Sequence, residues 1–167
     1  DIIKIRKFKN IIIFVDNFFK KKKIFKNSNL TRKIIYIDTT YEPTTNLIDK
    51  LISKLSKKKI DCIIGFGGGS ILDISKAVSI LLKNKGKCSK YVGWDKVQKP
   101  GVYKIAIPTL SGTGAEASKT CVFIDYKKKI KMGINSEYSL FDQVICDFKL
   151  QRTVPKEQFF YSAMDTY

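Results

Sequence analysis

The stretch that decides the fold is IDCIIGFGGGSILDISKAVSILL, residues 60–82. Its first part, residues 60–66, is apolar and rich in β-branched side chains, which predicts a strand buried on both faces. Residues 71–82 then repeat apolar side chains at helical spacing, which predicts a helix with one apolar side. That side is formed by Ile71, Ile74, Val78, Leu81 and Leu82. Three consecutive glycines and a serine, residues 67–70, therefore join a strand to a helix.

Gly67, Gly68, Gly69 and Ser70 lie in a context where a glycine run can bind an anion. Backbone N–H groups without neighbouring side chains can approach a phosphate, and the helix N-terminus adds a partial positive charge. The alternative is a tight turn without a ligand, but three glycines cost more conformational entropy than a turn requires. The run matches neither the Walker A loop nor G-x-G-x-x-G with an acidic residue about twenty positions later. We therefore expect a phosphate or pyrophosphate here, bound outside the ordinary Rossmann fingerprint.

Further strands and helices alternate on both sides of this stretch. Short apolar runs predict strands at residues 11–15, 34–37, 102–107, 120–124 and 144–146. A helix is predicted over residues 47–55, and Pro155 opens another near the C-terminus. Lys127–Lys129 indicates a hairpin-like turn, and the polar residues 83–100 indicate an excursion over the surface. This alternation predicts an α/β fold: an open, mostly parallel, Rossmann-like sheet flanked by helices, with its ligand crevice at the carboxyl ends of the strands.

A second loop of small residues follows the predicted strand at residues 102–107. It contains Thr109, Ser111, Gly112 and Thr113. Alone, such a loop is more often a turn than a site. Two such loops on parallel strands of one sheet converge on the same edge, where they could hold two parts of one dinucleotide.

The composition restricts the class of protein. The chain has 167 residues, the size of one domain, and no apolar run long enough to span a membrane. Its net charge of +17 comes from lysine, because only three of the 32 basic residues are arginine, the residue on which sequence-reading proteins depend. Joint enrichment in lysine and isoleucine is what drift in an AT-rich genome produces. We therefore expect neither a nucleic-acid partner nor a membrane partner, although a moderately positive cleft is compatible with the same charge.

The absence of histidine excludes Ser-His-Asp and Cys-His catalysis and any His-ligated metal within this chain. Residues 1–9 show no secretory signal. The cysteines lack C-x-x-C spacing, and three of them lie in apolar runs. They are Cys62, Cys88, Cys121 and Cys146. We expect reduced, buried thiols in a cytoplasmic protein rather than a zinc site.

Three stretches together resemble the iron-containing (group III) alcohol dehydrogenase family: residues 67–76, 107–116 and 163–165. Their order and spacing match, and the likeness covers nearly the whole chain as that family's N-terminal, dehydroquinate synthase-like domain. It implies hydride transfer between NAD or NADP and an alcohol or aldehyde. The implied cofactor contacts are Gly68, Gly69 and Ser70 for the phosphates, Thr109, Ser111 and Thr113 for the nicotinamide half and Asp16 for the adenosine half. Lys131 is implied as a basic cofactor contact, and Gly67, Asp73 and Gly112 as further cofactor contacts. From the residues alone, Asp73 is a negative charge that complements the helix dipole.

The resemblance also implies that Asp165 is the first ligand of a divalent metal, iron or zinc. The family's other ligands are three histidines, which this chain lacks. We therefore expect residues 1–154 to form the dinucleotide-binding domain and residues 155–167 to begin a helical metal-binding domain whose remainder is missing. The chain alone is then expected to bind cofactor without turnover, and the full-length protein to form a homo-oligomer.

Within the family, residues 91–95, 111–121, 141–143 and 158–167 resemble the 3-deoxy-manno-octulosonate 8-oxidase subgroup. That likeness implies oxidation of the terminal alcohol of a sugar acid used in lipopolysaccharide biosynthesis. Two other functions remain open at this stage. One is a nucleotide-binding module without catalysis, and the other is an enzyme similar to glycerol dehydrogenase or dehydroquinate synthase.

Overall fold

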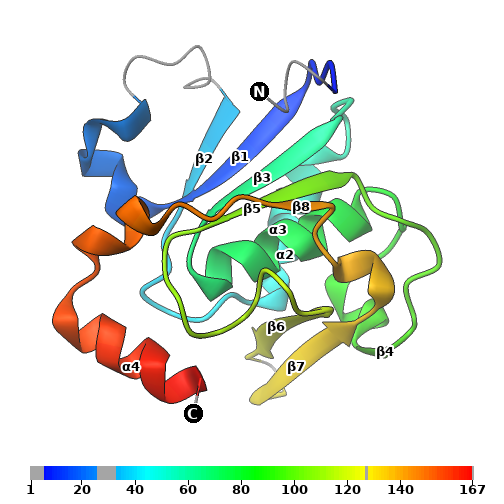
Figure 1. Ribbon diagram of the computed structural model, residues 1–167. Helices are drawn as coiled ribbons and strands as arrows, with labels where there is room; N and C mark the ends of the chain where they lie inside the picture. The colour runs from blue at the N-terminus through cyan, green and yellow to red at the C-terminus, as the bar shows by residue number, and fades with distance from the viewer. Residues whose placement is uncertain (1–5, 26–32, 127, 167) are drawn as a thin grey trace.

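A five-stranded sheet forms the centre of the fold (Figure 1). The computed structural model describes residues 6–25, 33–126 and 128–166. The sheet runs in the order β2-β1-β3-β5-β8, and all of its pairings are parallel. Its strands are β1 (Ile11–Asp16), β2 (Ile34–Ile37), β3 (Cys62–Gly67), β5 (Tyr103–Pro108) and β8 (Gln143–Val144). The strand order reverses between β1 and β3, which is where open α/β sheets bind their ligands. The predicted α/β class and mostly parallel sheet are confirmed.

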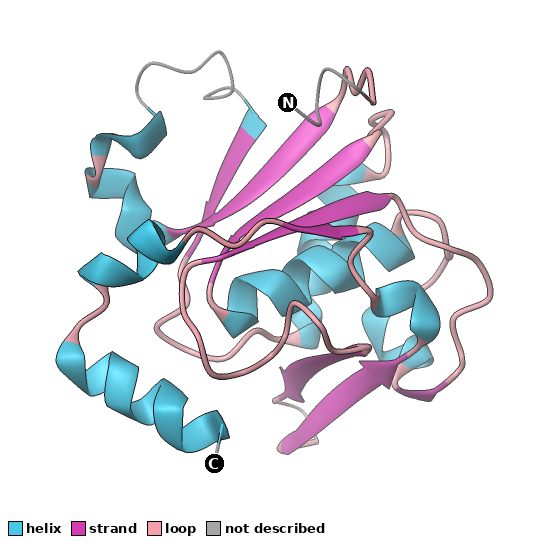
Figure 2. Cartoon of the chain, viewed as in Figure 1, coloured by secondary structure: helices cyan, strands magenta, loops and turns pink. Residues whose placement is uncertain are grey.

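Two long helices, α2 (Thr45–Leu55) and α3 (Gly69–Leu81), cover one face of the sheet. Figure 2 shows both of them behind the strands. Their apolar sides meet the sheet in one core, which joins Phe14 of β1 and Ile63 of β3 to Ile74 of α3. All three side chains are buried, which removes their apolar surface from water.

The opposite face carries 3-10 helices in the described part of the chain. They are η1 (Asn17–Lys21), η2 (Lys23–Phe25) and η6 (Phe148–Thr153). Phe19 of η1 packs edge-to-face on Phe66 of β3, with ring centroids 4.9 Å apart. The sheet is therefore flanked by long helices on one side and by short helical turns on the other.

A second sheet of three strands has the order β4-β7-β6. Its strands are β4 (Gly93–Trp94), β6 (Thr120–Asp125) and β7 (Ile130–Asn135). The predicted turn at residues 127–129 connects β6 to β7, although Lys127 itself lies outside the described residues. The sequence did not predict β7. It predicted a strand at residues 144–146, whereas β8 covers only Gln143–Val144, so the prediction is wrong for residues 145 and 146.

Two predictions about burial are wrong. Residues 83–100 are more than a surface excursion, because η4 (Cys88–Tyr91) is anchored on α2, where Cys88 N–H donates to Asp49 Oδ1 at 2.8 Å. Both ends of η4 are buried as a result. Cys146 is exposed rather than buried, because it follows the two-residue edge strand β8. The other three cysteines are buried, as predicted.

The C-terminal helix, α4 (Lys156–Thr166), lies away from the sheet at the lower left of Figure 1. Among its described side chains only Ser162 is buried. A short 3-10 helix, η5 (Glu137–Ser139), follows β7. Within the part of the chain that the structure describes, no helix is long and apolar enough to cross a membrane.

Candidate functional site

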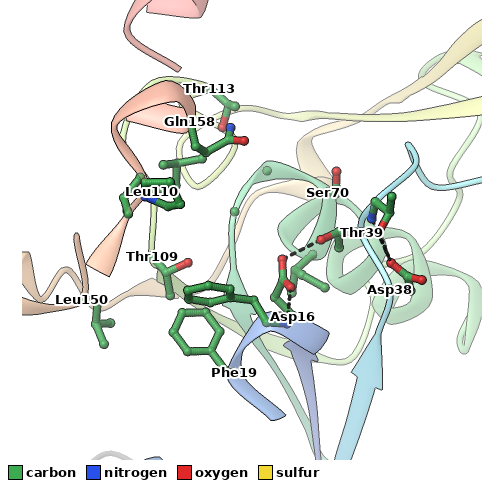
Figure 3. Close-up of a pocket in the computed structure, with 17 residues that line it drawn as sticks. Asp16, Phe19, Asp38, Thr39, Ser70, Thr109, Leu110, Thr113, Leu150 and Gln158 are labelled. Carbon is green, nitrogen blue, oxygen red and sulfur yellow. Dashed lines mark hydrogen bonds between the residues drawn. The ribbon is translucent and has the colours of Figure 1, made fainter. Parts of the chain in front are cut away.

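The carboxyl ends of the central strands open onto a cavity of about 530 Å³ (Figure 3). Asp16 ends β1, Gly68 follows β3 and Thr109 follows β5, and all three line the cavity. Pro155 and Gln158 line it from the C-terminal side. This volume is in the range of cofactor and small-molecule sites. The cavity lies at the carboxyl ends of the strands, as the sequence predicts, and the strand order places it at the switch point between β1 and β3.

The glycine run forms the N-terminus of α3 at this cavity. Gly68 is the N-cap and has no side chain to cap the helix, while its carbonyl accepts from Ile71 N–H at 3.0 Å. The first N–H groups of a helix lack partners within it, so those of Gly69 and Ser70 can bind an anion. Gly67 is needed for packing, because a Cβ there would lie 2.6 Å from Cγ1 of Ile71.

Two carboxylates lie at the far end of the cavity, after β1 and β2. Asp16 accepts a hydrogen bond from Thr39 Oγ1 at 2.6 Å. Asp38 accepts from Thr40 Oγ1 at 2.6 Å and from Thr40 N–H at 3.0 Å. Those two bonds hold the pKa of Asp38 below its ordinary value, so it is ionised at neutral pH. This end of the cavity therefore presents negative charge and hydroxyl groups.

The second predicted loop faces the glycine run. Thr109 N–H donates to the Gly67 carbonyl oxygen at 3.1 Å, which ties the two loops together. Thr113 lies against Gly69, where an added Cβ would lie 3.0 Å from Thr113 Oγ1. Thr109 and Thr113 both line the cavity. The structure thus brings the two loops to one place, as the sequence predicts.

A second cavity of about 460 Å³ adjoins the first. The residues common to both linings are Gly69, Ser70, Thr113 and Gln158. Asp73, Lys131 and Asp165 line the second cavity only. Lys131 Nζ lies 2.7 Å from Glu42 Oε1, and both side chains are substantially exposed. The predicted phosphate region therefore lies between an acidic end and an end that carries Lys131 and Asp165.

Ser111 and Gly112, also predicted as cofactor contacts, line neither of these cavities. Ser111 Oγ accepts from Gln151 Nε2 at 2.6 Å, and the Gly112 carbonyl accepts from Thr166 Oγ1 at 3.1 Å. Gly112 has a φ of 140°, and a Cβ there would overlap the Ser162 carbonyl oxygen. These two residues attach the loop to η6 and α4.

Asp73 has protein partners of its own. Its Oδ2 accepts from Val122 N–H at 3.0 Å, and its Oδ1 lies 3.5 Å from Nζ of the fully buried Lys76. Burial raises the pKa of Asp73 and lowers the pKa of Lys76, while their mutual attraction opposes both shifts. Asp73 lies beyond the first turn of α3, which holds no acidic residue, so the predicted role of complementing the helix dipole is wrong, and its carboxylate binds β6 and Lys76 instead.

The family model described as iron-containing alcohol dehydrogenase matches residues 2–148. The chain belongs to the iron-containing alcohol dehydrogenase family. Sulfoacetaldehyde reductase of Bilophila wadsworthia is 38% identical to it over 133 residues, which are 80% of this chain and 34% of that protein. Long-chain-alcohol dehydrogenase 1 of Geobacillus thermodenitrificans is 34% identical over 125 residues, which are 72% of this chain and 31% of that protein. The chain thus spans about a third of the length of these curated relatives.

The fold of this iron-containing alcohol dehydrogenase chain is that of solved structures. Sulfoacetaldehyde reductase of Bifidobacterium kashiwanohense, solved in complex with NAD+, superposes with a TM-score of 0.85 at 22% identity. The match covers 99% of this chain and 45% of that one. At this identity the likeness shows a common fold.

The described residues of the dehydrogenase chain do not form a metal site by themselves. Asp165 is exposed on α4, and no three His, Cys, Asp or Glu side chains among the described residues come together to hold a metal. A single carboxylate is too few ligands for a tightly bound divalent ion. The role of Asp165 as a metal ligand therefore stays a prediction of the resemblance.

Several residues of the first cavity were not predicted as site residues, among them Asp38 and Gln158. Asp38 directly follows β2, and an acidic residue at the end of a strand is a known signal for ribose recognition in dinucleotide-binding sheets. That signal could have been used. Gln158 lies beside Thr113 because α4 folds back over the loop, which no local pattern indicates (Figure 3).

Proposed function

We propose that this chain forms the NAD-binding part of an oxidoreductase that transfers a hydride between NAD and an alcohol or aldehyde. The observation that supports it is the pair of adjoining cavities, joined at Gly69, Ser70 and Thr113 over the N-terminus of α3. A dinucleotide has two halves joined by a pyrophosphate, and a helix N-terminus is suited to the pyrophosphate. In the proposed pose the adenosine half lies toward Asp16 and the nicotinamide half toward Lys131.

The carboxylates at the adenosine end favour NAD over NADP. Asp16 and Asp38 can accept hydrogen bonds from ribose hydroxyls, whereas they would repel a 2′-phosphate. The structure of the Bifidobacterium relative in complex with NAD+ agrees with this preference. We therefore propose NAD as the cofactor.

Oxidation of the alcohol breaks its carbinol C–H bond, the hydride passes to the nicotinamide, and the hydroxyl proton is lost as the carbonyl forms. A divalent metal, when bound, would polarise the substrate oxygen as a Lewis acid. This chain's own residues would bind the phosphates at Gly68–Ser70 and orient the ribose at Asp16. We propose Asp165 as one metal ligand.

The domain assignment and cellular context are also part of the proposal. Residues 1–154 would form the dinucleotide-binding domain, and residues 155–167 would begin the metal-binding domain. The scarcity of arginine supports the absence of a nucleic-acid partner, and the unpaired spacing of the cysteines supports a cytoplasmic location. The full-length protein is proposed to form a homo-oligomer without a membrane partner. A small alcohol or aldehyde is the proposed substrate class, and the sugar acid implied by the octulosonate oxidase likeness is a specific candidate within it.

The test is the reduction of NAD+ by the natural gene product with iron or zinc, followed by NADH absorbance. The panel holds primary alcohols of increasing length and 3-deoxy-manno-octulosonate, and the reverse reaction uses the matching aldehydes. Turnover with any of these supports the proposal and names the substrate. NADH binding without turnover on the whole panel would contradict it and indicate a non-catalytic nucleotide-binding module.

A further inference from the structure

We infer that Asp73 and Lys76 are positioning residues that hold the β6–β7 hairpin, and with it Lys131, against the phosphate-binding end of α3. The inference rests on the proposed function, because it gives the pair a role at the nicotinamide end of the same site. Lys76 stands one helical turn after Asp73, so both side chains leave the same side of α3.

The burial of Lys76 needs an explanation. Its side chain has no exposed surface, and an ammonium group can be buried only when hydrogen bonds and an opposite charge replace water. Nζ donates to the Thr120 carbonyl oxygen at 2.8 Å, lies 3.5 Å from Asp73 Oδ1 and stands 5.8 Å from the centroid of the Phe141 ring. Two of these three partners lie outside α3, so the charge joins the helix to other elements.

The pair caps the edge of β6 that faces away from β7. Ser136 N–H donates to the Lys119 carbonyl, and in antiparallel pairs the residues that bond to the partner strand alternate. Thr120 and Val122 therefore direct their backbone groups away from β7. Lys76 binds the Thr120 carbonyl, and Asp73 accepts from the Val122 N–H at 3.0 Å. Two side chains of α3 thus provide the hydrogen bonds that a neighbouring strand would otherwise supply.

This edge determines where Lys131 lies. Lys131 of β7 is paired with Ile124 of β6, two residues after Val122, so any shift of β6 moves Lys131 with it. Asp73, Val122 and Lys131 all line the second cavity, together with Ser70 at the start of α3. Lys131 is also held by Glu42 at 2.7 Å, and Ile124 N–H donates to the Pro43 carbonyl at 2.9 Å. The ion pair adds the link from α3, because it joins the helix that starts at the phosphate-binding turn to the strand that carries the partner of Lys131.

The test is a double-mutant cycle in the natural gene product, with Lys76→Met, Lys131→Ala and the double variant. If Lys76 acts through Lys131, each single change lowers kcat about tenfold or more, and the double variant is no worse than the poorer single one. NADH affinity in Lys76→Met should stay within about threefold of the parent, because the glycine turn is intact. If Lys76 has a purely structural role, the kcat losses of the two single variants should multiply in the double variant. That result would overturn the inference.

Lys104→Met is the matched control. Lys104 is also a buried lysine paired with a carboxylate, Asp142 at 3.4 Å, but it lines neither cavity. It should lower thermal stability as Lys76→Met does while leaving kcat within about twofold of the parent. An equal loss of kcat in both variants would refute the specific role of Lys76.

A second variant covers the case in which Lys76→Met does not fold. Asp73→Asn keeps an oxygen for the Val122 N–H and removes the charge, so it replaces Lys76→Met in the cycle. Hydrogen exchange gives a readout apart from activity. The Val122 amide should exchange faster in Lys76→Met, because β6 loses its anchor at Thr120, and also in Asp73→Asn, because a neutral amide oxygen accepts more weakly than a carboxylate. Unchanged protection of that amide would overturn the inference. A parent protein that binds no NADH would instead contradict the proposed function, so the two failures can be told apart.

Discussion

Substitution of Gly69 by alanine tests the two-cavity site at the point where its halves meet. Gly69 is the first residue of α3 and lines both cavities. The new Cβ would lie 3.0 Å from Thr113 Oγ1 and 3.1 Å from Thr113 Cγ2, so the methyl group narrows the passage between the loops. It also stands beside the N–H groups proposed to bind the pyrophosphate.

The stability of the fold should hardly change, whereas the NADH affinity should fall. Alanine is favoured over glycine in a helix by roughly 1 kcal/mol, and the Thr113 side chain can move, so the free energy of unfolding should change by less than about 1 kcal/mol. Loss of one hydrogen bond to a charged phosphate costs about 1.5–3 kcal/mol. That corresponds to a roughly ten- to hundredfold weaker NADH affinity.

The assay pairs a fluorescence titration of NADH with a thermal melt of the same samples. Gly133→Ala is the control, because a Cβ on that β7 residue would make only an ordinary contact, 3.4 Å from Thr120 Cγ2, outside both cavities. It should leave the NADH affinity unchanged. Gly69→Ala that binds NADH as tightly as the control would refute the assignment of the glycine turn.

Three further predictions follow from the same geometry. Asp38→Ser should shift the ratio of NADPH to NADH affinity about tenfold toward NADPH. In the parent that ratio should be flat between about pH 7.5 and pH 9, because the lowered pKa keeps Asp38 ionised and the 2′-phosphate, with a second pKa of about 6, is fully ionised there; a parent that prefers NADPH contradicts this. Iodoacetamide should label the exposed Cys146 and spare Cys62, because burial raises the pKa of the Cys62 thiol to about 12. Equal labelling of the two cysteines in peptide mass maps would contradict the burial of Cys62. In Gly112→Ala the new Cβ would overlap the Ser162 carbonyl oxygen, and the resulting strain of about 1–3 kcal/mol should detach α4 from the loop. The backbone amides of α4 should then exchange faster with solvent, and unchanged exchange of these amides would show that α4 does not depend on this contact.

The central strand and helix could be predicted because their side chains are buried in a regular pattern. Residues 60–66 and 71–82 were assigned from apolar content, and the structure places β3 at Cys62–Gly67 and α3 at Gly69–Leu81. The boundaries shift by one or two residues because backbone hydrogen bonds, rather than apolar side chains, decide where an element begins.

β7 was missed because it contains no continuous apolar run. Ile130, Met132 and Ile134 alternate with Lys131 and Gly133, which is the period-2 pattern of a half-buried strand, and Met132 and Ile134 are buried. That signal could have been used. The length of the strand also depends on β6, which provides a partner for each of its residues.

The site shows a similar division. The glycine turn is a local motif, and its position between a strand and a helix is enough to predict a phosphate site there. Asp73 and its partner Val122 are 49 positions apart in the sequence, and the burial of Lys76 depends on the Thr120 carbonyl of the three-stranded sheet. No spacing within one motif encodes such contacts, because they depend on how the second sheet packs on α3.

Calorimetric titration of the protein with NADH measures binding at the two-cavity site directly. We expect saturable binding of one NADH per chain, with a Kd well below about 1 mM, and competition by fragments that carry only the adenosine half. Absence of saturable binding at about millimolar NADH would contradict the dinucleotide site formed by Asp16, the glycine turn and Lys131.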